Sequence, residues 1–129
     1  MKEFQALDDQ LSRPVSLAPP QESETLRVLR RGRERITKGW IRHHLAADAY
    51  GDPVYSPDAS TARYWCALGA ISWHFGETPA VLALARALPA RYLDENFIAE
   101  SVAQFNNFNP EGLAGVVALF DRAIAAEGG

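Results

Sequence analysis

The chain has 129 residues, 47% of them hydrophobic, which is enough for one buried core and too few for two ordinary domains. Its formal net charge of −3 disfavours whole-surface attraction to nucleic acid or to an anionic membrane, because that attraction grows with the number of phosphates neutralised. Cys66 is the only cysteine, which excludes an intrachain disulfide. No stretch reaches the length of about eighteen apolar residues that a membrane span requires. The charged N-terminal residues are unlike a secretory signal, so we expect a cytoplasmic protein.

Residues 1–22 are predicted to be an N-terminal arm ahead of one helical domain at 23–127. Phe4, Leu7 and Leu11 are spaced as one apolar edge of a short helix, and the prolines that follow prevent a long one. A helix of about three turns is too short to be stable alone. We therefore expect the arm to bury these side chains on its own domain or on a neighbouring molecule, with a frayed tail as the alternative.

The first long helix is expected to begin at Ser23 and to reach Thr37 or beyond, because serine caps the free amides at a helix start. One face of this helix is apolar, which predicts that it packs into the core. That face carries Leu26, Leu29, Ile36 and Trp40. A second face is basic, and it either stays solvated or docks an acidic partner. That face carries Arg27, Arg31, Arg35, Lys38 and Arg42.

The sequence WCALGA, residues 65–70, lies in a stretch that is apolar on nearly every side. Ser56 and Pro57 are typical of a helix start, and Gly76 of a helix end. A helix that is apolar all round must be enclosed by other helices. We therefore predict an all-α protein, a compact bundle of about five helices around a central buried helix at residues 57–75, without competing strands.

Three further helices are expected after the central one. Thr78 and Pro79 repeat the helix-start signal, for a helix that reaches about Leu88. A shorter helical stretch is expected between residues 93 and 104. Asn109 and Pro110 are expected to start the last helix, which has an apolar stripe at helical spacing. The stripe comprises Leu113, Val116, Val117, Phe120 and Ile124.

Cys66 is the candidate nucleophile of a cysteine-dependent hydrolase or transferase. A reactive thiolate needs a helix N-terminus or a nearby cation, whereas the predicted helix places Cys66 more than two turns inside. A buried structural cysteine is therefore favoured, with Gly69 allowing a second helix to approach closely. The enzyme alternative requires a histidine within reach, with His44 as the candidate. The adjacent pair His43 and His44 lacks the spacing of a metal-binding helix, so we expect no metal and no cofactor.

Arg33 lies at the interior edge of the predicted first helix, where an arginine needs a partner. One interpretation is an internal ion pair with Asp58, Glu100 or Asp121. The other is a cleft in which Arg33 binds the carboxylate or phosphate of a small ligand.

The sequence FNNFN, residues 105–109, gathers three amides between two aromatic side chains. Asn106 and Asn107 either brace turns through bonds to the backbone or, with Trp40, line the ligand site next to Arg33. The two interpretations are indistinguishable at the level of sequence.

Three short motifs together resemble a known group of proteins: the Gly39–Trp40 pair, CALGA at residues 66–70, and an asparagine pair before VVALFDRAI. The chain is similar, over residues 25–126, to small bacterial and phage proteins grouped as a domain of unknown function. Those proteins carry a Cys-x-x-Gly-Ala motif and a Trp-Asn-Asp-like motif. This chain has Phe105 and Asn107 where tryptophan and aspartate are common, so Asn107 cannot serve as a base. The resemblance implies a fold and a cellular setting, and no established activity.

The leading expectation is a non-enzymatic interaction or accessory module that docks a protein partner, or another copy of itself, through the arm and exposed apolar surface. The first alternative is an enzyme that uses Cys66 with His44. The second is a binder of a small anionic ligand near Arg33. Nucleic acid is disfavoured because no aromatic residues interleave with the basic face to stack on bases.

Overall fold

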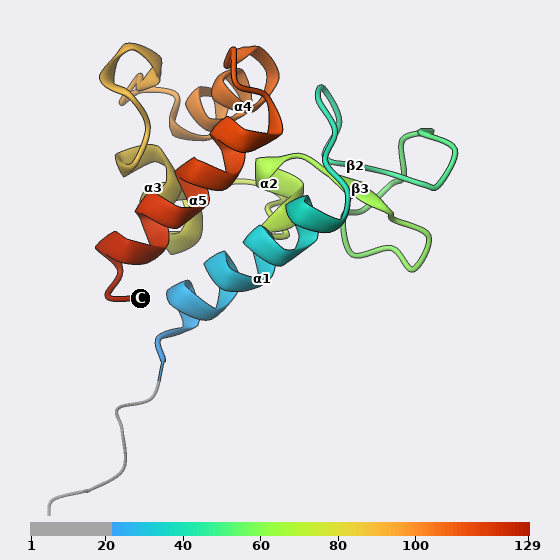
Figure 1. The fold of residues 1–129 in the computed structure, drawn as a ribbon, viewed down its shortest axis with the longest axis horizontal. Helices are drawn as coiled ribbons and strands as arrows, with labels where there is room; N and C mark the ends of the chain where they lie inside the picture. Colours follow the sequence, from blue (N-terminus) through green and yellow to red (C-terminus); the bar gives the residue numbers. More distant parts are fainter. Residues whose placement is uncertain (1–21) are drawn as a thin grey trace, which may run out of the picture.

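The computed structural model describes residues 22–129, and the predicted arm, except for Glu22, lies outside them (Figure 1). The described part is mostly helical, as predicted, with one small two-stranded sheet. In chain order the elements are α1 (Glu24–Lys38), β2 (Ala46–Ala47), β3 (Tyr64–Trp65), α2 (Ala67–Ala70), α3 (Pro79–Arg86), the 3-10 helix η1 (Ala90–Tyr92), α4 (Ile98–Phe108) and α5 (Leu113–Ala126).

Helix α1 begins where the sequence predicts. The Ser23 hydroxyl accepts a hydrogen bond from the Leu26 amide at 3.1 Å, so it is the N-cap. The buried face includes Leu29 and Ile36, which are fully buried. This face packs along α5, and the two helices run side by side in Figure 1. The apolar stripe of the sequence thus predicts the packing of α1 correctly.

The predicted central helix at residues 57–75 is wrong. Only α2, four residues long, forms there, and the Ser56 hydroxyl accepts from the Asp58 amide in a local turn instead of starting a helix. Ser72 ends the helical path, because its φ of 57° lies in the left-handed region. Residues 66–71 are nevertheless all buried. An all-round apolar pattern therefore indicated burial correctly and helix length incorrectly.

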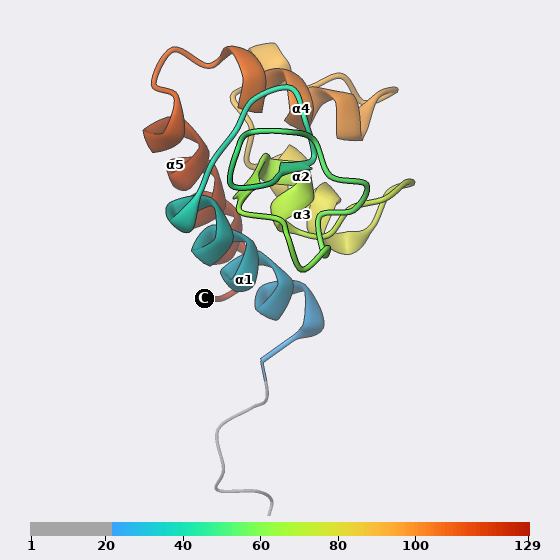
Figure 2. The same ribbon diagram turned by 90° about the vertical axis from the view of Figure 1, so that its right-hand side faces the viewer.

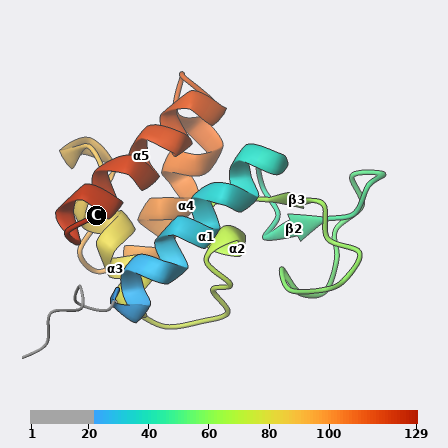
Figure 3. The same cartoon turned by 60° about the horizontal axis from the view of Figure 1, so that its bottom comes forward.

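Residues 40–66 form a lobe built from loops and the antiparallel pair β2–β3, which the sequence did not predict. Ala46 is paired with Trp65 and Ala47 with Tyr64. Figure 3 shows this lobe projecting to one side of the helical body, and in Figure 2 it lies in front of α2. The only regular structure in this segment is four strand residues. Most of its backbone hydrogen bonds nevertheless lie within the lobe, such as those from the Arg63 amide to the Ala47 carbonyl and from the Cys66 amide to the Leu45 carbonyl.

Helix α4 packs against α2 from the other side, and α3 packs against α4 and α5. The predicted start of α3 is confirmed, because the Thr78 hydroxyl accepts from the Val81 amide at 3.3 Å. Helix α4 extends to Phe108, beyond its predicted end, so the FNNF residues are helical. Helix α5 starts at Leu113, after Gly112 with a φ of 62°, and not at Asn109. No helix within residues 22–129 has the length and apolar character to cross a membrane.

Gly69 makes the close contact that the sequence predicts, but its neighbour is a loop and not a second helix. A Cβ at Gly69 would overlap the backbone carbonyl oxygen of Leu45 and lie 2.7 Å from its carbonyl carbon. The lobe thus approaches α2 backbone to backbone, and only glycine leaves room for that approach.

We predict that Gly69→Ala lowers the free energy of unfolding by roughly 1 to 3 kcal/mol, because overpacking outweighs the gain in helix propensity. Gly32→Ala is the matched variant, since its Cβ would meet the Phe120 ring at 2.7 Å, and side chains shift more readily than backbone. Urea unfolding of both variants measures the difference. A Gly69 variant as stable as the parent, or more stable than Gly32→Ala, contradicts the backbone contact.

Candidate functional site

Asn106 on α4 is the centre of a buried hydrogen-bond network. Its Oδ1 accepts from Trp40 Nε1 at 2.8 Å and from the Ala67 amide at 3.0 Å. Its Nδ2 donates to the Ile41 carbonyl at 3.2 Å and to Asn107 Oδ1 at 3.1 Å. Asn106 is fully buried, so the protein itself satisfies this side chain. The network joins α4 to the end of α1 and to the start of α2.

Asn107 extends this network toward the lobe. Its Oδ1 accepts from the His43 amide at 2.8 Å, and His43 has a φ of 73°. The side chain of Asn107 thus holds a turn that L residues rarely adopt. Trp40, Asn106 and Asn107 lie together, without Arg33, and their polar groups bind one another and the backbone. Ligand binding at these residues stays a prediction.

Arg33 lies apart from this network, on the surface between α1 and α5. Its Nε donates to Asp121 Oδ1 at 2.6 Å, and the two side chains are 42% and 52% exposed. This hydrogen bond and the Asp121 charge raise the pKa of Arg33. Arg33 is thus half-exposed at the edge of α1, and its ion pair lies at the surface and not in the interior. The internal pair was expected with one of three acids, and Asp121 is the partner.

Cys66 is the N-cap of α2 and is not placed inside a long helix. Its side chain is buried at 6% exposure, and Sγ accepts from the Gly69 amide at 3.3 Å. Burial raises the pKa of the thiol. Within residues 22–129 no histidine is hydrogen-bonded to Cys66: the candidate His44 is exposed, His43 packs on Phe108, and His74 Nε2 lies 4.0 Å from Asp58 Oδ2. This environment opposes thiolate formation and disfavours nucleophilic chemistry.

The arginines of α1 differ in their partners. Arg31 donates to the Ser72 hydroxyl at 3.1 Å and has no carboxylate partner within residues 22–129. The other four each pair with a carboxylate, namely Arg27 with Glu24, Arg30 with Glu22, Arg33 with Asp121, and Arg35 with Asp58. Arg31 is thus the one arginine of α1 that forms no ion pair with a carboxylate of the described residues.

Ser72 connects Arg31 to Asp58. Its hydroxyl accepts from Arg31 and from Arg35, each at 3.1 Å, and donates to Asp58 Oδ1 at 2.6 Å. The Ser72 hydrogen bond, followed by the bonds and charges of the arginines, holds the pKa of Asp58 below its ordinary value. Because an acid of lowered pKa is a weak base, this cluster does not activate Ser72 as a nucleophile. It fixes the segment after α2 against α1.

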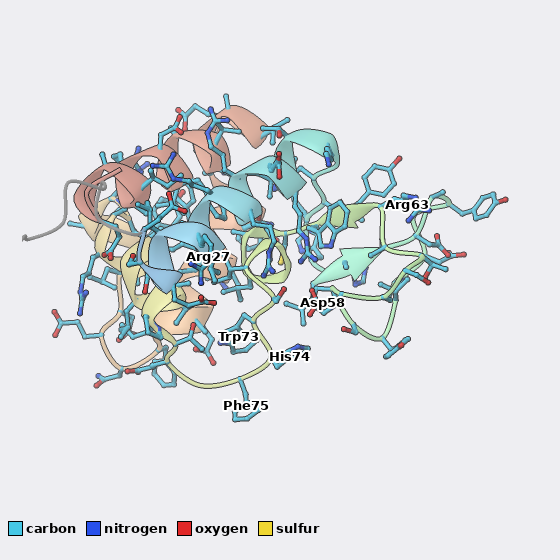
Figure 4. All side chains as sticks on the ribbon, turned by 90° about the horizontal axis from the view of Figure 1, so that it is seen from below. Arg27, Asp58, Arg63, Trp73, His74 and Phe75 are labelled. Atoms are coloured by element: carbon cyan, nitrogen blue, oxygen red, sulfur yellow. The ribbon has the colours of Figure 1, made fainter. Side chains whose placement is uncertain are left out.

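This segment forms one wall of a groove that we call the α1–α3 groove, with a volume of about 270 Å³. Its apolar part comes from Val28, Ile71, Trp73 and Ala80. The remaining lining residues are Glu24, Thr25, Arg31, Ser72, Thr78 and Pro79. Figure 4 shows Trp73 on this side of the molecule, with Phe75 pointing away into solvent. Phe75 is 82% exposed.

A larger hollow of about 540 Å³ lies along α1 where Arg33 meets Asp121, but its lining is mostly charged and contains ion pairs already made. The smaller groove is the better candidate site, because apolar walls with few polar groups are typical of binding sites. Within residues 22–129 no three His, Cys, Asp or Glu side chains are grouped to hold a metal.

Sequence reasoning did not single out the apolar residues of the groove. The sequence pattern places Arg31 only on a basic face, and it does not mark Val28 or Trp73 as residues of a site. The groove exists because Ser72 turns the chain back toward α1, and no helical periodicity signals that turn. Trp73 and Phe75, two residues apart in the chain, are the one local signal of an apolar surface here.

We predict that Asn106→Ala lowers the free energy of unfolding by about 2 to 4 kcal/mol, because it leaves buried donors and an acceptor unpaired. Asn96→Ala, at an exposed site before α4, is the control and is expected to change it by less than about 0.5 kcal/mol. Chemical denaturation provides the comparison. Equal losses in the two variants contradict the network.

Cys66 is predicted to react slowly with iodoacetamide in the native protein at neutral pH and fully in urea. Since burial raises the pKa of the thiol, the native rate rises only above the ordinary cysteine pKa of about 8.5. The measurement is the alkylation rate from pH 6 to pH 10, with the unfolded protein as reference at each pH. Fast native modification near pH 7 supports the enzyme alternative instead.

The comparisons with known proteins identify a family and no activity. No curated protein and no solved structure matches the chain. The model of a family of unknown function, DUF6197, matches residues 20–126, which include every described helix and strand up to the last residue of α5. The chain therefore belongs to this family of unknown function, DUF6197.

Proposed function

We propose that this protein is a non-enzymatic interaction module that binds a segment of a partner protein in the α1–α3 groove. The observation that carries the proposal is the apolar surface of the groove, formed by Val28, Ile71, Trp73 and Ala80. Phe75, two residues after Trp73 in the chain, is also exposed. Contiguous apolar surface next to solvent is characteristic of interaction sites. Aromatic side chains in such positions often provide most of the binding energy.

The size of the groove favours a protein segment over a cofactor. Its volume of about 270 Å³ lies below the range of roughly 300 to 1,000 Å³ that encloses drug-sized ligands. One bulky apolar side chain with its adjoining backbone fits such a space. The groove is also open to solvent along α1, so a chain can enter and leave it.

The chemistry of the candidate nucleophiles supports a module without catalysis. The Cys66 thiol is buried and its pKa is raised, while the Ser72 hydroxyl donates to Asp58 rather than to a histidine. We place the module in the cytoplasm of a bacterium or a phage-infected cell. The single cysteine and the resemblance to small bacterial and phage proteins support that setting.

Binding in the groove is tested with N-acetyl-leucine N-methylamide as the probe and protein-observed NMR as the measurement. We expect millimolar binding that shifts the Trp73 indole and the Val28 and Ile71 methyl signals. Thr25→Trp fills the groove and abolishes the shifts. Thr37→Trp, the same substitution on the last turn of α1 outside the groove, leaves them unchanged.

The Thr37 variant controls for the general effect of a new tryptophan on α1. Both variants should keep the melting temperature of the parent, since the two threonines are not buried. Shifts that persist in Thr25→Trp, or that centre on other residues, exclude the groove as the binding site.

A further inference from the structure

We infer that the segment bound in the α1–α3 groove presents a carboxylate beside its apolar side chain, and that this carboxylate pairs with Arg31. The inference rests on the proposed function and specifies the chemistry of the partner. Its basis is the difference between Arg31 and the four other arginines of α1. Each of those four has a carboxylate partner, whereas Arg31 binds only the neutral Ser72 hydroxyl among residues 22–129.

The geometry leaves Arg31 able to accept such a ligand. Arg31 lines the groove, and its guanidinium has five N–H donors, of which Nη2 binds Ser72. Asp58 forms its ion pair with Arg35 and none with Arg31, whose link to this carboxylate runs through the Ser72 hydroxyl. The Ser72 bond instead orients Arg31 along the groove wall. A carboxylate entering the groove therefore meets an oriented guanidinium.

The charges around the groove favour a single carboxylate over a phosphate. Glu24 also lines the groove, and its pairing with Arg27 leaves Arg31 as the one unmatched cation of the described lining. A dianion would be repelled by Glu24 and would find only one guanidinium. The N-terminal end of α3 at Pro79 and Ala80 adds a partial positive charge to the same lining. An apolar residue followed by Asp or Glu matches this combination.

The test uses the full chain and two probes, N-acetyl-Leu-Asp N-methylamide and its Leu-Asn counterpart, titrated by NMR at low ionic strength. We expect the aspartate probe to bind about fivefold more tightly, as for a solvent-accessible ion pair. Arg31→Gln removes this preference without abolishing binding of the asparagine probe. Arg33→Gln, which changes an arginine of α1 outside the groove, preserves it.

The outcomes separate the inference from the proposed function. Equal affinity for both probes in the parent protein, or a preference that survives Arg31→Gln, overturns the carboxylate inference and leaves the groove as a binding site. Failure of both probes to bind overturns the proposed function itself.

The chain contains the same pattern at Leu7–Asp8. Binding seen only in a Leu7→Ser variant would identify the chain's own segment as the occupant and overturn the partner assignment.

Discussion

The buried amide of Asn106 is the interaction on which the rest of this structure depends. The backbone hydrogen bonds of residues 40–66 lie mostly within that lobe, so the lobe needs separate contacts to attach it to the helices. Asn106 provides such contacts, because its two amide atoms together bind the Trp40 indole, the Ile41 carbonyl and the Ala67 amide. One side chain thus positions the end of α1, the entry into the lobe and the first turn of α2.

The same arrangement determines where the groove forms. Helix α2 is held at its start by Asn106 and at its end by Arg35, which donates to the Gly69 carbonyl at 3.3 Å and to Ser72 at 3.1 Å. Between these two anchors α2 packs against the lobe with no room for a side chain at Gly69. The chain leaving α2 must then turn at Ser72. Residues 71–73 and 78–80 then form the second wall of the groove.

Local signals predicted the helix ends, while the site required contacts that no local signal encodes. Ser23 and Thr78 cap helices as expected, because a cap depends on amides only three residues away. Asn106 binds Ala67 and Trp40, which precede it in the chain by 39 and 66 positions. In the sequence alone, its amide is therefore indistinguishable from one that braces a nearby turn. At residues 57–75 the apolar pattern correctly indicates burial by neighbouring elements. The helix itself is shorter than predicted, because a turn forms at Ser56 and Ser72 has a left-handed backbone conformation.

Native-state hydrogen exchange of the Ala67 amide tests the central role of Asn106 most directly. This N–H donates to a buried side-chain oxygen and not to a regular helix or sheet. If the network holds the fold together, the Ala67 amide exchanges only through global unfolding, with the same free energy as the most protected amides of α5. Exchange through a local opening, at a free energy near that of exposed loop amides, would show that the lobe and α2 detach from α4 while the helices stay folded.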